Sequence, residues 1–88
     1  MIELTGCRFE VCFNATDDLK DIWALRGFNE EANRIYWPSP VISYEIDELD
    51  VVITTKSDSL YKLKGVSYDN SFIQDLNDVI ENGGWQVL

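Results

Sequence analysis

The sequence predicts an α+β fold in which a mostly antiparallel sheet of about four strands carries two main helices on one of its faces. Two observations predict this class. Several short segments alternate apolar and polar residues or are rich in β-branched residues, as is typical of strands, and one later segment has apolar residues at helical spacing. The chain has 88 residues without a repeat or a linker, which suits one compact domain over residues 1–88. The expected order of elements is β-α-(α)-β-β-β-α.

The first predicted strand covers residues 8–13, where apolar side chains alternate with two charged residues and a cysteine. Ile2 and Leu4 alternate in the opposite phase, and Gly6 lies between the two phases. This pattern indicates either a bulge in one long strand or a tight turn between two short strands.

Two helices are predicted next. Residues 14–27 have apolar residues at helical spacing, with Asn14 or Thr16 available to cap the N-terminus and Gly27 as a natural end. A second, short helix is predicted over residues 29–36, and the prolines that follow would end it, because proline lacks the amide donor.

The middle of the chain predicts three strands: Val41 to Ile46, Val51 to Thr55 and Leu60 to Tyr68. Gly65 marks a bulge or bend in the third of them. Short polar turns separate the three, which is typical of an antiparallel meander with one packed face and one solvated face.

The last helix is predicted over Ser71 to Asn82, where five apolar residues form a stripe on one face. Ser71 or Asp69 caps its start, and Gly83 with Gly84 ends it. The four residues after it either add a short edge strand or fold over the core. The expected core consists of the following residues: Phe9, Val11, Phe13, Leu19, Ile22, Ile42, Ile46, Val51, Ile53, Leu63, Phe72, Leu76, Val79 and Ile80.

The sequence lacks the residues that several kinds of catalytic and metal-binding site require. There is no histidine, which removes Ser-His-Asp and Cys-His arrangements and imidazole metal sites. The glycines form no phosphate-binding pattern, and the acidic corner at residues 47–50 lacks the spacing of a calcium loop. Cys7 and Cys12 have neither the spacing of a redox pair nor the partners of a zinc site. We therefore expect no enzyme, no catalytic residue, no cofactor and no metal, and two reduced thiols in a cytoplasmic protein.

Charge is the strongest compositional feature. The chain has 7 basic and 16 acidic residues, a net charge of −9. Residues 1–44 contribute 4 − 7 = −3 and residues 45–88 contribute 3 − 9 = −6, so the charge is concentrated in the second half. Such carboxylates either form solvated faces or provide an electrostatic footprint for a basic partner surface. They repel phosphate, so direct binding of nucleic acid is not expected, and no apolar run approaches the ~20 residues that a membrane span requires.

The leading functional hypothesis is a non-catalytic inhibitor that occupies the basic surface of a nucleic-acid-handling protein and mimics the charge of DNA. Aromatic residues next to the prolines at 38 and 40 add possible anchors, because Trp and Tyr are frequent in binding hot spots. The candidate partner-binding residues are Glu45, Asp47, Glu48, Asp50, Asp75, Asp78, Glu81, Tyr36 and Trp37.

Small size, acidity, missing catalytic residues and α+β order together are similar to the profile of several groups of small inhibitory proteins. These are phage-encoded anti-restriction and anti-CRISPR proteins, uracil-glycosylase inhibitors, and immunity proteins against nuclease toxins. The resemblance implies an inhibitor but covers no motif and transfers no residue. Two alternatives stay open: an immunity protein that neutralises a nuclease toxin, and a self-associating structural or accessory domain that pairs through a strand edge or through Tyr36 and Trp37. Monomer and homodimer are both compatible with the sequence.

Overall fold

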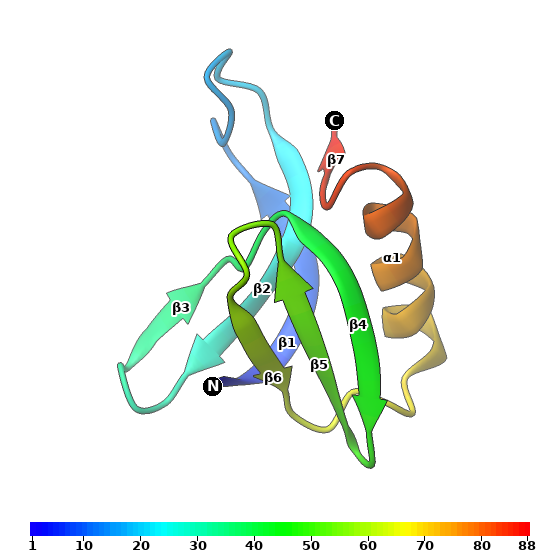
Figure 1. Ribbon diagram of the computed structural model, residues 1–88. Helices are drawn as coiled ribbons and strands as arrows, with labels where there is room; N and C mark the ends of the chain where they lie inside the picture. Colours follow the sequence, from blue (N-terminus) through cyan, green and yellow to red (C-terminus); the bar gives the residue numbers. More distant parts are fainter.

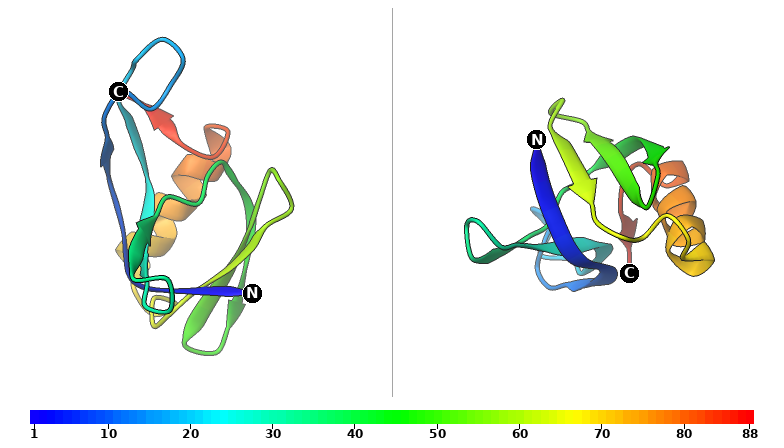
Figure 2. Two further views of the ribbon diagram at one scale, coloured as in Figure 1. Left: turned by 90° about the vertical axis from the view of Figure 1, so that its left-hand side faces the viewer. Right: turned by 90° about the horizontal axis from the view of Figure 1, so that it is seen from below.

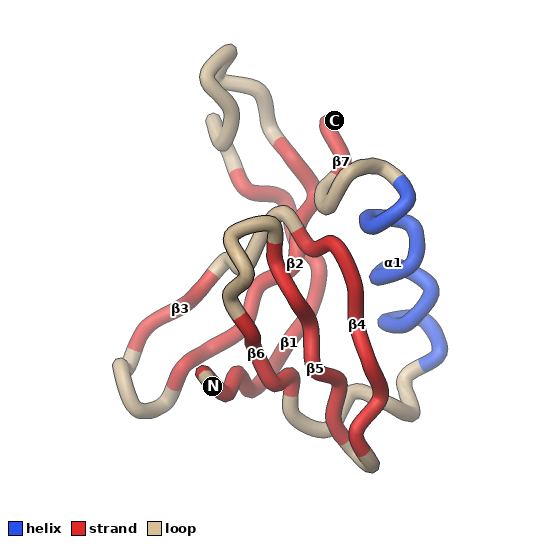
Figure 3. Tube along the Cα trace, viewed as in Figure 1, coloured by secondary structure: helices blue, strands red, loops and turns tan.

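The computed structural model describes all 88 residues and is mostly sheet, with a single helix (Figures 1 and 3). The elements are β1 (Ile2–Cys12), β2 (Ile22–Asn29), β3 (Arg34–Tyr36), β4 (Val41–Asp47), β5 (Asp50–Thr55), β6 (Leu60–Leu63), α1 (Asn70–Glu81) and β7 (Gln86–Val87). The sheet order is β3-β2-β1-β6-β5-β4, and β7 also pairs with β2. The predicted class of about four strands under two helices is therefore wrong, because seven strands and one helix are present.

Strand β1 joins the two halves of the sheet. Its first residues, Ile2 to Leu4, pair in parallel with β6, whereas residues 8–12 pair antiparallel with β2. The register shifts between Thr5 and Arg8, and Gly6 has a φ of 57°, so of the two alternatives the bulge in one long strand is the correct one. Because β1 bends there, the half of the sheet formed by β1 and β2 faces the half formed by β4, β5 and β6. Helix α1 lies at the open side between the two halves (Figure 2).

The core fills the space between the two halves and the helix. Leu76 and Val79 of α1 are completely buried beside Val51 and Ile53 of β5. Fully burying one such side chain stabilises the fold by about 1.5–3 kcal/mol. The complete core cluster is Leu4, Leu25, Val41, Val51, Ile53, Leu63, Val66, Phe72, Leu76 and Val79.

The predicted C-terminal helix and the antiparallel meander are confirmed. The carboxylate of Asp69, and not the side chain of Ser71, caps α1 by accepting a hydrogen bond from the Phe72 amide at 3.0 Å. Strands β4, β5 and β6 pair antiparallel in sequence order. The third of them ends earlier than predicted, at Leu63, because the chain turns at Gly65, whose φ is 73°. The last residues form the edge strand β7 on β2.

The helix predicted over residues 14–27 is wrong. Residues 13–21 form a loop, and β2 begins at Ile22. Strand β2 buries both of its faces: Ile22 and Ala24 lie on one face, and Leu25 and Gly27 lie on the other. A strand buried on both faces lacks the alternation that reveals strands, so its apolar residues also fit a helical stripe. Gly27 is required for close packing, because a Cβ there would lie 2.8 Å from Leu4 Cβ.

The short helix predicted over residues 29–36 is also wrong, because this segment is a hairpin turn followed by β3. The side chain of Asn29 accepts a hydrogen bond from the Ala32 amide at 2.7 Å, and Asn33 has a φ of 54°. Asparagine stabilises tight turns through both features, which outweigh helix propensity here.

Half of the predicted core is buried as expected, but five members are exposed. Ile22, Val51, Ile53, Leu63, Phe72, Leu76 and Val79 are buried, and Phe9 and Ile80 pack partly buried against the core. Ile42 lies at the register shift between Val41 and Ser43. Ile46 lies opposite the buried Val51 but belongs to the edge strand β4, which has no neighbouring strand on its outer side. Val11, Phe13 and Leu19 are exposed at the far end of the β1–β2 hairpin.

Helix α1 is neither long nor apolar enough to cross a membrane.

Candidate functional site

The first acidic group belongs to the β4–β5 hairpin, and we call Glu45, Asp47, Glu48 and Asp50 the hairpin carboxylates. Residues that lie opposite each other in a sheet share a face. Glu45 lies opposite Val52, and Val52 lies opposite Lys62 on β6. Glu45, Asp47 and Asp50 therefore share the outer face of this sheet with Lys62 of β6.

Lysines partly neutralise this group. Lys62 Nζ lies 3.6 Å from a carboxylate oxygen of Asp47, and Lys64 Nζ lies 3.0 Å from one of Asp50 and 3.8 Å from one of Glu3. The Gly65 amide also donates to Asp50 at 2.9 Å. This amide bond and then Lys64 lower the pKa of Asp50, and Asp50 raises the pKa of Lys64.

Glu48 occupies the turn of the same hairpin, with a φ of 55°. Its carbonyl oxygen accepts a hydrogen bond from the Ser67 hydroxyl at 2.7 Å. This bond ties the turn to the segment before α1, while the carboxylate stays exposed and forms no ion pair.

The second acidic group lies on α1, and we call Asp75, Asp78 and Glu81 the helix acidic row. Its members are three residues apart and therefore neighbours along one side of the helix. The opposite side packs into the core through Phe72, Leu76 and Val79. None of the three forms an ion pair, and residues 65–88 contain no lysine or arginine.

The row carries an unfavourable concentration of negative charge. Partial burial raises the pKa of Asp75 from its ordinary value, and the nearby Asp78 and Asp69 carboxylates raise it further. Gln74 donates a hydrogen bond to Asp78 at 3.0 Å, which fixes that side chain without neutralising it. Asp50 of the hairpin and Asp75 of the row thus have pKa shifts of opposite sign.

The two groups do not form one continuous surface. The core cluster joins α1 to Val51 and Ile53 on the inner face of the meander, whereas three of the hairpin carboxylates lie on its outer face. The boundary is the edge of β4, where the Tyr44 hydroxyl donates to the side-chain oxygen of Asn77 at 2.8 Å. The structure therefore brings Asp75, Asp78 and Glu81 together and separates them from the hairpin.

The two predicted aromatic anchors lie elsewhere. Tyr36 ends β3, and its half-buried ring packs edge-on against Tyr61 at 6.3 Å between ring centres. The Arg34 guanidinium lies 4.7 Å from the centre of the Tyr36 ring. Trp37 follows with 37% of its surface exposed. Figure 1 places β3 and α1 on opposite sides of the molecule, so these aromatics do not join the helix acidic row.

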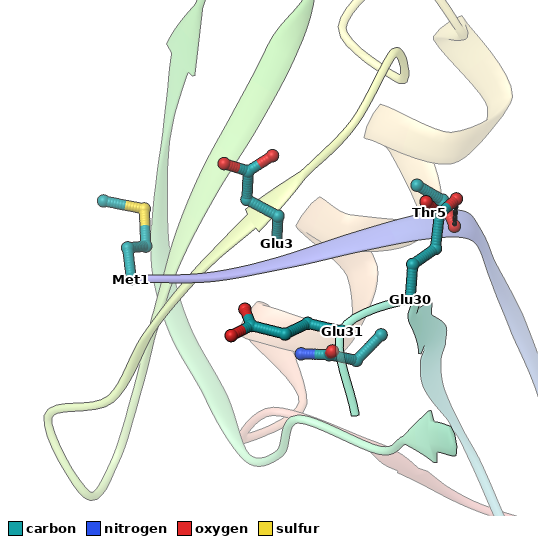
Figure 4. Close-up of a pocket in the computed structure, with 6 residues that line it drawn as sticks. Met1, Glu3, Thr5, Glu30 and Glu31 are labelled. Carbon is teal, nitrogen blue, oxygen red and sulfur yellow. Dashed lines mark hydrogen bonds between the residues drawn. The ribbon is translucent and has the colours of Figure 1, made fainter. Parts of the chain in front are cut away.

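An open polar cleft of about 390 Å³ lies beside the N-terminus. Figure 4 shows Glu3 and Thr5 along β1 and Glu30 and Glu31 on the facing β2–β3 turn. The Thr5 hydroxyl donates to a Glu30 carboxylate oxygen at 3.4 Å. The cleft offers acceptors to a cationic group, but no three of its acids are arranged to hold a metal ion. The cleft was not predicted from the sequence, because the helices predicted over residues 14–27 and 29–36 exclude the turn that brings Glu30 and Glu31 to β1.

Both cysteines are free, half-buried thiols. The Cys7 thiol donates to the Leu4 carbonyl oxygen at 3.5 Å, and burial raises the pKa of Cys7 to about 12. The thiol therefore stays protonated at neutral pH, and a protonated thiol is neither a nucleophile nor a metal ligand.

Comparison with protein-family models, with curated proteins and with solved structures found no match to this chain.

Proposed function

We propose that the protein is a non-catalytic inhibitor that places its helix acidic row on the basic surface of a nucleic-acid-handling protein. The observation that supports this is the lack of any ion pair along the row, in contrast to Asp47 and Asp50 of the hairpin, which are paired with lysines. Uncompensated carboxylates that already repel one another gain free energy when a partner supplies lysines or arginines.

The spacing of the row suits the mimicry of a nucleic-acid strand. Residues three apart on an α-helix advance by about 4.5 Å, and one strand of duplex DNA presents one charge per about 3.4 Å of axis. The core holds α1 rigidly through Leu76 and Val79, so the charges are presented at fixed positions. The same charges disfavour direct binding of DNA or RNA.

A cytoplasmic location belongs to the same proposal. The proposed nucleic-acid-handling partner would be found there, and free thiols such as Cys7 and Cys12 are compatible with a reducing compartment.

The test is affinity capture from a bacterial lysate with the full chain as bait. The helix-row variant combines Asp75→Asn, Asp78→Asn and Glu81→Gln. A matched control removes the same charge from the hairpin by combining Glu45→Gln, Asp47→Asn and Glu48→Gln. Circular dichroism confirms that each variant is folded before capture.

We expect the wild type and the control to retain a nucleic-acid-handling protein that the helix-row variant loses. Added duplex DNA should release it, and so should raising the salt from about 0.05 M to about 0.5 M, because salt screens exposed charges. After purification of that protein, the helix-row variant should bind it at least about tenfold more weakly than the control does. Equal capture by the helix-row variant and the wild type, or a complex that duplex DNA does not displace, would show that the proposal is wrong.

A further inference from the structure

The loop between β1 and β2, residues 13–21, projects from one end of the molecule (Figure 1). It carries two large apolar side chains that the sequence pattern assigns to the core. Phe13 is 72% exposed and Leu19 is 70% exposed, and among the large apolar side chains only Tyr68 is more exposed. Other large apolar side chains are exposed as well, but this short loop carries two of the three most exposed ones.

The loop has a defined conformation because it is closed by its own hydrogen bonds. The donors and acceptors are Ala15 N to Lys20 O at 2.9 Å, Leu19 N to Thr16 O at 2.9 Å, Lys20 N to Thr16 Oγ1 at 3.0 Å, and Asn14 N to Asp21 Oδ1 at 3.1 Å. A loop that is ordered before binding loses less conformational entropy when a partner binds. Phe13 and Leu19 are therefore presented by a preorganised segment.

The backbone conformation of Leu19 is unfavourable for a leucine. Leu19 has a φ of 56°, a left-handed conformation that costs free energy for a residue with a Cβ. Asn14 in the same loop has a φ of 53°, and asparagine tolerates this region better than leucine does. Because the Leu19 side chain is largely exposed, burial in the fold does not offset the cost. Backbone strain that no packing within the fold offsets is often found at functional sites.

The same loop is acidic. Within the loop, Asp17, Asp18 and Asp21 outnumber Lys20, so the segment has a net charge of 1 − 3 = −2. The chain terminus is tied to its base, because the Leu88 amide donates to the Asp21 carbonyl oxygen at 3.0 Å.

Two further elements reach the same end of the molecule. β7 pairs with the start of β2 through Val87 and Ile22, which leaves Val87 and Leu88 exposed there. Helix α1 runs towards this end and finishes at Glu81 (Figure 1). This end therefore combines exposed apolar side chains with acidic residues.

We propose that Phe13 and Leu19 are the apolar anchor of an interface and insert into an apolar pocket with a basic rim on a protein partner. The basic character of the rim rests on the proposed function and on the charge of the loop. Anchors of this kind commonly sit at the centre of an interface within a polar rim. A second copy of this chain is disfavoured as the occupant, because each copy has a net charge of −9 and two such loops would repel each other.

The first measurement uses the isolated protein and separates an anchor from a structural role. Leu19→Asn and Phe13→Ser are compared with Tyr68→Ser, which removes an equally exposed aromatic ring near the start of α1. We expect Leu19→Asn to keep or raise the denaturation midpoint, and Phe13→Ser to change it no more than Tyr68→Ser does. A clear loss of stability in both loop variants, as large as that of Leu76→Ala in the core, would overturn the proposal.

The second measurement identifies the occupant. A photo-reactive benzophenone side chain is placed at position 19 or, as control, at position 68, and the full chain is irradiated in bacterial lysate. We expect a cross-link from position 19 alone, to a protein segment in which apolar residues are flanked by lysine or arginine. Cross-links to a second copy or to lipid, or equal labelling from both positions, would overturn the proposal.

Affinity for the purified cross-linked protein completes the test. The Phe13→Ser and Leu19→Asn double variant should bind it at least about tenfold more weakly than the wild type, and Tyr68→Ser should bind within about threefold. If only the proposed function fails, the helix-row variant will bind as the wild type does while the loop variant still loses affinity. If only the anchor fails, the loss will appear in the helix-row variant and not in the loop variant.

Discussion

The hairpin carboxylates and the helix acidic row come from the same acidic half of the chain, but the fold places them in opposite electrostatic environments. On the outer face of the meander, Lys62 and Lys64 lie within 4 Å of Asp47 and Asp50, and the Gly65 amide donates to Asp50. On α1 no lysine or arginine forms an ion pair with the row, and partial burial, followed by the nearby Asp78 and Asp69 carboxylates, raises the pKa of Asp75. A count of charges does not distinguish the two groups, and only the pairing with lysines identifies the group that remains free for a partner.

The largest effect should come from removing the support of the row. Leu76 is completely buried under α1, so Leu76→Ala should cost about 2–5 kcal/mol of unfolding free energy. Leu49 in the hairpin turn is 57% exposed, and Leu49→Ala should stay within about 0.5 kcal/mol of the wild type. Urea unfolding of the two variants measures the difference. Similar losses in both would mean that the helix is not anchored as described.

The next largest effect should come from the hairpin. Asp50→Ala removes the acceptor of the Gly65 amide and the partner of Lys64, whereas Asp47→Ala removes only the longer contact with Lys62. We therefore expect a clear fall in the urea midpoint for Asp50→Ala and a smaller one for Asp47→Ala at neutral pH. Equal midpoints would contradict the role assigned to the Gly65 bond.

The Asp50 effect should also depend on pH. The pKa of Asp50 is lower in the folded protein than its ordinary value of 3.8, so its stabilising contribution is complete above that value. The contribution is lost as the pH falls through the lowered pKa. The charge-dependent part of the difference between wild type and Asp50→Ala should therefore shrink in strong acid, and unfolding measured at neutral pH and below about pH 3 tests this.

The parts of the fold that sequence analysis predicted are those whose pattern has one explanation. Helix α1 and strand β5 each bury one face, so spacing alone assigns them. Strand β2 buries both faces and gives no such pattern, and without its assignment β3, β7 and the exposed loop could not be placed. Local spacing does not record that Phe13 and Leu19 lie beyond the end of the sheet.

The candidate site also has a part that could be predicted from the sequence and a part that could not. The carboxylates of the helix acidic row follow from helical spacing, and their position on one side of α1 was predictable. The neutralisation of Asp47 and Asp50 was not, because Lys62 and Lys64 reach them only through the pairing of β5 with β6. Contacts between distant segments decide which charges are free, and a single sequence does not show these contacts.

Removing a lysine should reduce the difference in carboxylate pKa between the hairpin and the helix. Lys64→Gln removes the cation beside Asp50 and Glu3 but leaves the Gly65 amide in place. The amide bond is the largest cause of the lowered pKa, so the pKa of Asp50 should rise only part of the way to its ordinary value. Carboxyl chemical shifts followed by NMR through an acid titration measure the change. A full return to the ordinary value would show that Lys64, rather than the amide, controls this carboxylate.

The smallest effect should be a gain of stability on the helix. The pKa of Asp75 is raised in the folded protein, first by partial burial and then by Asp78 and Asp69, so its charged form opposes folding. Asp75→Asn should therefore stabilise the protein at neutral pH, by less than about 1 kcal/mol because the group is near the surface. The opposition is complete above the raised pKa and disappears below the ordinary value of 3.8, so the advantage of the variant should vanish in acid. Urea unfolding at about pH 7 and about pH 3 measures it, with Asp50→Asn on the hairpin as the control expected to lose stability at neutral pH instead. A loss of stability in Asp75→Asn at neutral pH would remove the distinction between the two acidic groups, because the row would then be compensated within the fold and would gain nothing from a basic partner.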